Sequence, residues 1–297
     1  MRRRSDFPAY LAMRAMLGAV GALPRPVSLA AGAMLGRAAR ALGMRRAVTD
    51  GNLARAFPEL PQSERDALAG RIFAHFGRMA VDSMRLSAIG PASLLPLVRG
   101  GECVRLLEAQ IPRDRGAIIL TGHVGNWELA GAYLAASGYP LAAVVKPPSN
   151  PYVARHAESV RARLGIETIP MPEARSGVMA ALRNRKVVAL VADQGALRSS
   201  TWAPFFGQPT RTPSGPGLFA ARSGAPVLFG ALMAHPDGGY ELMGDLIEEE
   251  VKGDAAEVTE RIAVKYRERL EAVVRRFPEQ YLWTHRLWKQ APPVPAV

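Results

Sequence analysis

The chain has 297 residues, 48% of them hydrophobic and 22% charged, which excludes a disordered tail or a fibre and allows one large domain or two small ones. A single cysteine excludes an internal disulfide framework and a multi-cysteine metal site. The 38 Lys and Arg residues exceed the 26 Asp and Glu residues, giving a formal net charge of +12, so nucleic acid, anionic lipid and acidic protein are the candidate partners.

The N-terminal stretch is both basic and apolar. Residues 1–50 contain nine Arg and two Asp, a local balance of +7, among many Ala, Leu, Met and Gly residues. A spanning helix needs about 20 consecutive apolar residues, but Arg and Pro divide this stretch into runs at 15–24 and 26–36, and the recurring Arg residues do not fit a cleavable signal peptide. We expect residues 1–45 to be a helical segment lying on an anionic membrane surface; an ordinary helical pair packed on the domain is the alternative.

The rest of the chain, residues 46–297, is expected to form one α/β domain. A helical pattern covers residues 61–87, and from residue 116 onward short apolar runs alternate with helical patterns. This alternation predicts a central, largely parallel sheet flanked by helices. Strands are predicted at 117–120, 141–145, 187–191 and 226–232, and helices at 126–137, 151–164, 173–184, 214–223 and 255–277.

A histidine follows the first of these strands. His123 lies in a Gly-flanked turn that leads into a helix, which places it at the carboxyl edge of the sheet, where open α/β folds bind ligands. If His123 precedes the helix, the Glu128 carboxylate can accept a hydrogen bond from one ring nitrogen and leave the other as a general base. No Ser or Cys nucleophile elbow lies nearby, which favours direct proton removal from a hydroxyl over a covalent intermediate. On these residues alone, a capping His beside a surface Glu is the alternative.

Six segments, in the same order, resemble the bacterial late acyltransferases of lipid A biosynthesis, a branch of the glycerolipid-type acyltransferases. His123 and Glu128 match the H-x4-D/E motif of that superfamily. Lys146 stands in a motif where the branch usually has Arg. The five segments besides the H-x4-D/E motif are residues 52–59, 146–151, 161–165, 193–207 and 278–286.

The resemblance implies an O-acyltransferase that moves a fatty acyl chain from acyl carrier protein or acyl-CoA to a hydroxyl of a lipid A precursor. It implies action at the cytoplasmic face of the bacterial inner membrane, with no metal and no cofactor besides the thioester co-substrate. His123 would be the general base and Glu128 its orienting partner, while the helix start near Asn126 and the guanidinium of Arg161 would stabilise the oxyanion. Further expected contacts with the phosphorylated glycolipid are Lys146, Asn150, Arg163, Asp193 and Arg198.

Three alternatives stay open on the sequence. Asp193 and Arg198 follow the strand predicted at 187–191 and could line the acceptor pocket, but a mutual loop salt bridge fits them equally well. The acceptor could be another glycolipid, such as a phosphatidylinositol mannoside, because that branch shares the H-x4-D/E core. Nucleic-acid binding is a distant alternative, since no RNA-binding aromatic motif, zinc spacing or helix–turn–helix signal accompanies the positive charge.

Overall fold

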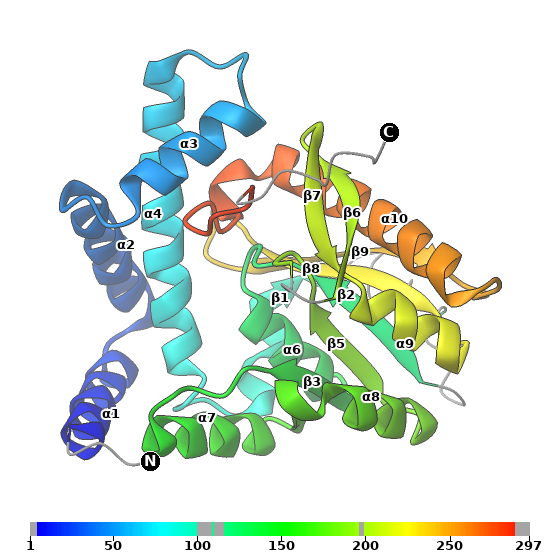
Figure 1. Cartoon of the computed structure of the whole chain (residues 1–297). Coiled ribbons are helices and arrows are strands. Elements are labelled where there is room, and N and C mark those ends of the chain that lie inside the picture. The colour runs from blue at the N-terminus through cyan, green and yellow to red at the C-terminus, as the bar shows by residue number, and fades with distance from the viewer. Residues whose placement is uncertain (1–4, 100–108, 110–115, 196–198, 289–297) are drawn as a thin grey trace.

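The computed structural model describes residues 5–99, 109, 116–195 and 199–288 (Figure 1). The helices are α1 (Asp6–Ala22), α2 (Arg25–Ala41), α3 (Arg46–Ala56), α4 (Gln62–Arg85), α6 (Trp127–Ala136), α7 (Pro151–Arg163), α8 (Ala174–Arg183), α9 (Gly215–Ser223) and α10 (Ala255–Arg276). The strands are β1 (Val98–Arg99), β2 (Ala117–Thr121), β3 (Leu141–Val145), β4 (Ile166–Pro170), β5 (Val187–Val191), β6 (Ser200–Phe205), β7 (Gln208–Pro213), β8 (Val227–Ala234) and β9 (Tyr240–Glu248).

A seven-stranded sheet with the order β1-β9-β8-β2-β5-β3-β4 forms the centre of the molecule. Strands β8, β2, β5, β3 and β4 are mutually parallel, whereas β9 is antiparallel to β8 and parallel to β1. The predicted α/β fold with a mostly parallel sheet is confirmed. The five helices predicted after residue 116 are also confirmed, each to within one residue at either end. The antiparallel pair β6–β7 lies outside this sheet.

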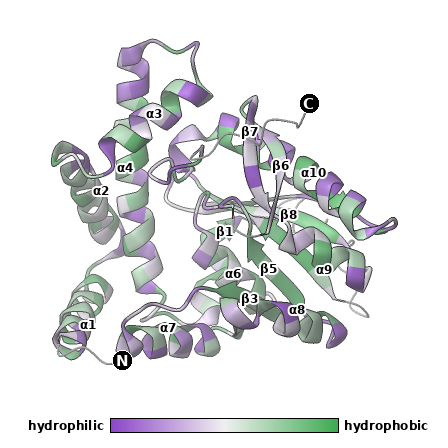
Figure 2. Ribbon diagram, viewed as in Figure 1, coloured by the Kyte–Doolittle hydropathy of each residue, from purple (hydrophilic) through white to green (hydrophobic). Residues whose placement is uncertain are grey.

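Helices cover both faces of the sheet. Successive side chains of a strand point to opposite sides, so each central strand contributes side chains to the core on both faces. Ile118 and Leu120 of β2 belong to a core cluster with buried residues of α8, α9 and α10. Ala117 and Ile119 belong to a second cluster with buried residues of α6. Figure 2 shows the hydrophobic residues concentrated along the central strands, which are therefore buried from both sides.

The N-terminal helices differ in how firmly they attach. Helix α2 packs along α4 with backbone touching backbone, since a Cβ atom at Gly77 would lie 2.0 Å from the carbonyl oxygen of Gly32. Helix α1, in contrast, has no buried residue. The outer side of this pair exposes large apolar side chains, and Met34 and Leu35 are each 68% exposed.

The same N-terminal helices were expected to lie on a membrane. Across the described ranges, no helix combines the length and the apolar character needed to cross a bilayer. Helix α2 is a packed element of the domain on one side and an exposed apolar surface on the other. Membrane association of residues 1–45 stays a prediction.

Three motif segments that are far apart in the sequence meet in space. The side-chain amide of Asn52, in α3, donates to the carbonyl oxygens of Trp283 and His285 at 2.7 and 2.6 Å. Trp283 is fully buried, and its ring packs edge-on against Phe57 and Phe206. The segments 52–59, 193–207 and 278–286 therefore share one aromatic core, and much of their sequence pattern reflects packing.

Candidate active site

The site forms where the neighbouring parallel strands β2 and β5 end. Thr121 is paired with Val191 at the last position of the two strands, and His123 and Asp193 each follow two residues later. The Nδ1 atom of His123 lies 2.7 Å from Oδ1 of Asp193, and the backbone N–H of His123 donates to Oδ2 of Asp193 at 3.1 Å. One carboxylate thus fixes both the backbone and the ring of the histidine.

The protonation of this pair follows from burial and charge. The His123 side chain is 24% exposed and that of Asp193 only 2%. Burial alone would lower the pKa of His123, but the carboxylate of Asp193, helped by the charge of Glu128, outweighs it and raises the pKa above its usual value. Burial alone would raise the pKa of Asp193, yet contact with His123 and the charge of Arg267 lower it. Asp193 is therefore ionised and accepts the Nδ1 proton, which leaves Nε2 as the nitrogen that can take a proton.

Glu128 does not make the hydrogen bond that we expected. Its carboxylate oxygens accept from Nη2 of Arg161 at 3.0 and 3.3 Å. Glu128 lies in the first turn of α6, beyond the turn that holds His123, so its side chain leaves the backbone in another direction. The structure corrects the expectation of a direct contact: Asp193 is the carboxylate on the ring, and Glu128 acts on His123 only through space while it binds Arg161.

Further side chains close around the His123 ring. The indole of Trp127 lies edge-on, with ring centroids 4.8 Å apart, and the side-chain amide of Gln194 lies 3.2 Å from Nδ1. Sequence reasoning assigned no role to Gln194, although it directly follows Asp193 in the matched motif. In the sequence, its position directly after a carboxylate at the end of a predicted strand was the feature that could have indicated a role in the site.

Helix α10 holds the ends of both strands. The hydroxyl of Tyr266 donates to the carbonyl oxygen of Thr121 at 2.8 Å, and the buried guanidinium of Arg267 donates to the carbonyl oxygen of Asp193 at 2.9 Å. Arg267 also donates to the carbonyl oxygen of Arg211 at 3.0 Å, which connects β7 to the site. Sequence reasoning missed both residues, because it predicted a helix at 255–277 without assigning a role to any residue in it.

Asn126 has a structural role instead of the expected contact with substrate. It is fully buried, and its Oδ1 caps α6 by accepting from the backbone N–H of Leu129 at 3.1 Å. A chain of buried polar groups leads away from this cap. The Asn126 amide lies 3.4 Å from the hydroxyl of Tyr240, which donates to Asp82 at 2.6 Å, and Asp82 forms an ion pair of 2.6 Å with Arg25 at the start of α2.

The other expected contacts with substrate divide among several places. Asn150 caps α7 and donates to the carbonyl oxygen of Asp6 at 2.8 Å. Arg163 donates to the carbonyl oxygens that end α4, both at 2.8 Å, so it joins α7 to α4. Lys146 is exposed just after β3. Arg198 lies outside the described residues. Of the predicted set, the structure brings together His123, Glu128, Arg161 and Asp193.

An apolar groove of about 270 Å³ opens beside Glu128 and Arg161, which form part of its wall. Helices α1, α4 and α7 supply most of its lining, including Met13, Leu17, Met84, Val153, Val160 and Leu164. The groove has the apolar character that suits a hydrocarbon chain. Over the described ranges, no group of three or more His, Cys, Asp or Glu side chains is placed to hold a metal ion.

A parallel α/β sheet with an aspartate-oriented histidine at its carboxyl edge and an apolar groove alongside is typical of a transferase that activates a hydroxyl and handles an apolar group. Comparison with known sequences supports this class. The family model described as bacterial lipid A biosynthesis acyltransferase matches residues 2–290. The chain belongs to that family and is an O-acyltransferase.

Named relatives act on two kinds of glycolipid. The lipid A biosynthesis lauroyltransferase of Escherichia coli is 30% identical over 282 residues, covering 91% of this chain and 88% of that protein. The lipid A biosynthesis palmitoleoyltransferase of the same species is 28% identical over 275 residues, covering 91% and 87%. The phosphatidylinositol mannoside acyltransferase of Mycobacterium tuberculosis is 28% identical over 229 residues, covering 74% and 71%.

Proposed function

We propose that this acyltransferase moves a fatty acyl chain from a thioester, carried by acyl carrier protein or by CoA, to a hydroxyl of a lipid A precursor, with His123 as the general base. The observation that supports the proposal most directly is the 2.7 Å contact between Nδ1 of His123 and Asp193. This contact fixes the tautomer with Nε2 free and stabilises the imidazolium that forms when Nε2 takes a proton.

The chemical steps follow from this geometry. Nε2 of His123 removes the proton of the acceptor hydroxyl as that oxygen attacks the thioester carbonyl. The tetrahedral intermediate then expels the thiolate, which recovers the proton from the imidazolium, so no acyl-enzyme forms. The intermediate carries an oxyanion, and we assign its stabilisation to Arg161 and to the N-terminal end of α6.

Glu128 then has a role different from the one first expected. Its ion pair with Arg161 holds the guanidinium beside the first turn of α6, close to the turn that carries His123. Arg161 has five N–H donors and uses only part of them on Glu128. Glu128 would therefore act as a positioning residue for the oxyanion donor.

The apolar groove is the proposed seat of the acyl chain. Because Glu128 and Arg161 form part of its wall, a chain lying between α1, α4 and α7 would place its thioester carbonyl next to the same guanidinium. Side chains from α1 complete the groove, so the N-terminal segment would contribute to substrate binding and not only to membrane attachment.

The lipid acceptor is proposed to be reached at the cytoplasmic face of the bacterial inner membrane. Large exposed apolar side chains gather on α1, on α2 and on the turn after α2. The Arg residues in the same stretch would lie near anionic headgroups. The acceptor would be a phosphorylated glycolipid; nucleic acid has no part in this proposal.

A second acceptor class has its own support. The mycobacterial relative is named a phosphatidylinositol mannoside acyltransferase and shares 28% identity with this chain. The lipid A relatives align over a larger share of both proteins, 91% of this chain against 74%, which favours a lipid A precursor as the acceptor.

The test is an acyl-transfer assay with purified protein in anionic vesicles. Labelled acyl carrier protein and acyl-CoA thioesters are each combined with a lipid A precursor or a phosphatidylinositol mannoside, and the product is identified by mass. The His123→Ala variant should lose transfer. The matched control is His235→Ala, because His235 also faces an aspartate, Asp237, at 2.9 Å but lies in another loop. Full transfer by a folded His123→Ala variant would overturn the mechanism.

A further inference from the structure

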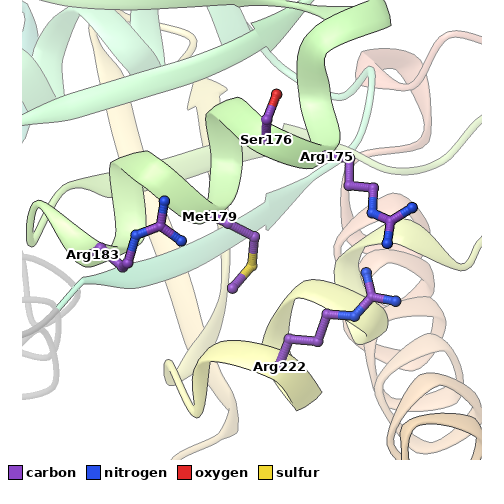
Figure 3. A pocket seen from close by; sticks show the side chains of 5 residues that line it. All are labelled: Arg175, Ser176, Met179, Arg183 and Arg222. Carbon is purple, nitrogen blue, oxygen red and sulfur yellow. The ribbon is translucent and has the colours of Figure 1, made fainter.

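A second cavity lies between α8 and α9, on the face of the sheet opposite to α6. It has a volume of about 520 Å³ and is lined by Arg175, Ser176, Met179, Arg183 and Arg222. Figure 3 shows the side chains of Arg175 and Arg222 extending toward one another across the groove, with Met179 between the two helices. Three guanidinium groups thus surround one apolar side chain at an open surface. We call this feature the arginine groove.

The positive charge of the arginine groove has no acidic counterpart in the part of the chain that the structure describes. None of its three Arg residues forms an ion pair with a carboxylate among the described residues. On the neighbouring helix α10, by comparison, Arg261 pairs with Glu248 at 3.1 Å and Arg275 with Glu271 at 2.7 Å. Like charges brought together without acidic partners oppose folding, so the cluster contributes no ion-pair stability. An anionic ligand would supply the missing counter-charge.

The arginine groove is connected to the active site through the sheet. Helix α8 starts soon after β4 ends, and β4 is parallel to β3, β5 and β2, so Arg175 in its first turn lies at the edge that carries His123 and Asp193. Helices α8 and α9 lie on the side of the molecule away from α1 and α2 (Figure 1). A bilayer contacting the exposed apolar side chains of α2 would leave the arginine groove open to a soluble partner.

The spread of the charges decides the kind of ligand. Arg175 and Arg183 are eight residues apart on one helix, which separates them by about 12 Å along its axis. A partner that carries several separated anionic groups matches such a spacing, and Met179 offers an apolar contact in between. An acidic protein surface has both features, since its carboxylates are spread over such distances and apolar side chains lie among them; CoA, with its separated phosphate groups, is the alternative that the experiment tests.

We propose that the arginine groove docks the acidic surface of the carrier protein that presents the acyl thioester. The inference rests on the proposed function, in which acyl carrier protein is one of the two donors considered. The carrier would sit over α8 and α9, its thioester arm would pass the carboxyl edge of the sheet, and the acyl chain would enter the apolar groove beyond Arg161.

The experiment compares two double variants with the same change of charge. Arg183→Glu with Arg222→Glu reverses two charges of the groove; Arg71→Glu with Arg276→Glu reverses two exposed charges on α4 and α10. Transfer is measured with lauroyl and palmitoleoyl thioesters of acyl carrier protein and of CoA, at several salt concentrations. Direct binding of the holo-carrier protein to each folded protein is measured in parallel.

The groove variant should raise the KM for the carrier-protein thioester about tenfold or more, with a weaker salt dependence and little change in kcat. Its KM for acyl-CoA should equal that of the control variant. Equal KM values for the carrier in both variants, or a wild-type protein that accepts only acyl-CoA, would overturn the docking inference while leaving the acyltransferase mechanism intact. Wild-type protein that binds the carrier through the groove but transfers from no donor would instead refute the proposed function.

Discussion

Replacing Asp193 by asparagine tests which carboxylate supports the proposed base. The Asp193→Asn change keeps the volume of a side chain that is only 2% exposed and removes only its charge. Because Arg267 donates to the backbone carbonyl of residue 193, that support of the loop persists. The variant should fold, and thermal unfolding checks that it does.

The expected loss follows from the contact at Nδ1. A charge-assisted bond of 2.7 Å becomes a neutral one, so the ring loses both its preferred tautomer and the carboxylate that stabilises the imidazolium. A positioned general base contributes about 10²–10⁴-fold to rate, and we expect kcat to fall about 10²–10³-fold, equivalent to about 3–4 kcal/mol in activation free energy.

The pH profile gives a readout that misfolding would not produce. His123 acts as a base only when neutral, so wild-type activity should fall as the pH drops through its raised pKa. In Asp193→Asn, less negative charge counteracts the effect of burial, so the pKa of His123 falls. The acid limb of the kcat/KM profile therefore moves to lower pH. Glu128→Gln removes the same charge without touching the ring, so its shift should be smaller. Unchanged kcat in Asp193→Asn, with the larger loss and shift in Glu128→Gln, would refute the assignment.

Four further variants test packing and the membrane surface. Gly77→Ala should lower the free energy of unfolding by about 1–3 kcal/mol, because its Cβ meets backbone, whereas Gly70→Ala, on the same helix in open space, should raise it by about 0.5–1 kcal/mol; denaturant unfolding measures both. Replacing Met34 and Leu35 with Glu should reduce co-sedimentation with anionic vesicles about tenfold or more; unchanged binding would remove the membrane role of α2. Asn52→Ala breaks two hydrogen bonds, one buried and one partly buried, and should cost about 2–3 kcal/mol in thermal or denaturant unfolding.

Local pattern was enough to predict most of the fold and the position of the base. The strands at 141–145 and 187–191 are confirmed at both ends, since each is a short apolar run between helical patterns. Strands β1, β4, β6, β7 and β9 were not predicted. Strand β4 contains Glu167 and ends in Pro170, and β9 contains a glycine and several charged residues, so neither is a continuous apolar run.

The partner of His123 could not be predicted from spacing. Glu128 lies only five positions after His123, which made this carboxylate the natural candidate. Asp193 lies 70 residues away and reaches the ring only because β5 pairs with β2, although β3 and β4 come between them in the chain. The order of the strands depends on how whole helices pack across the sheet, and no motif in the sequence predicts that order.

The close packing of α2 against α4 has a geometric consequence for the reaction. Two helices whose backbones touch at glycine cannot slide or separate without breaking the contact. The ion pair of Arg25 with Asp82 and the hydroxyl of Tyr240 continue that rigid connection to the cap of α6. The distance of the His123 imidazole from the outer surface of α2 is therefore fixed by the packing of these helices. With the outer surface of α2 on a bilayer, the enzyme would acylate only a hydroxyl that lies at the matching distance from the membrane surface.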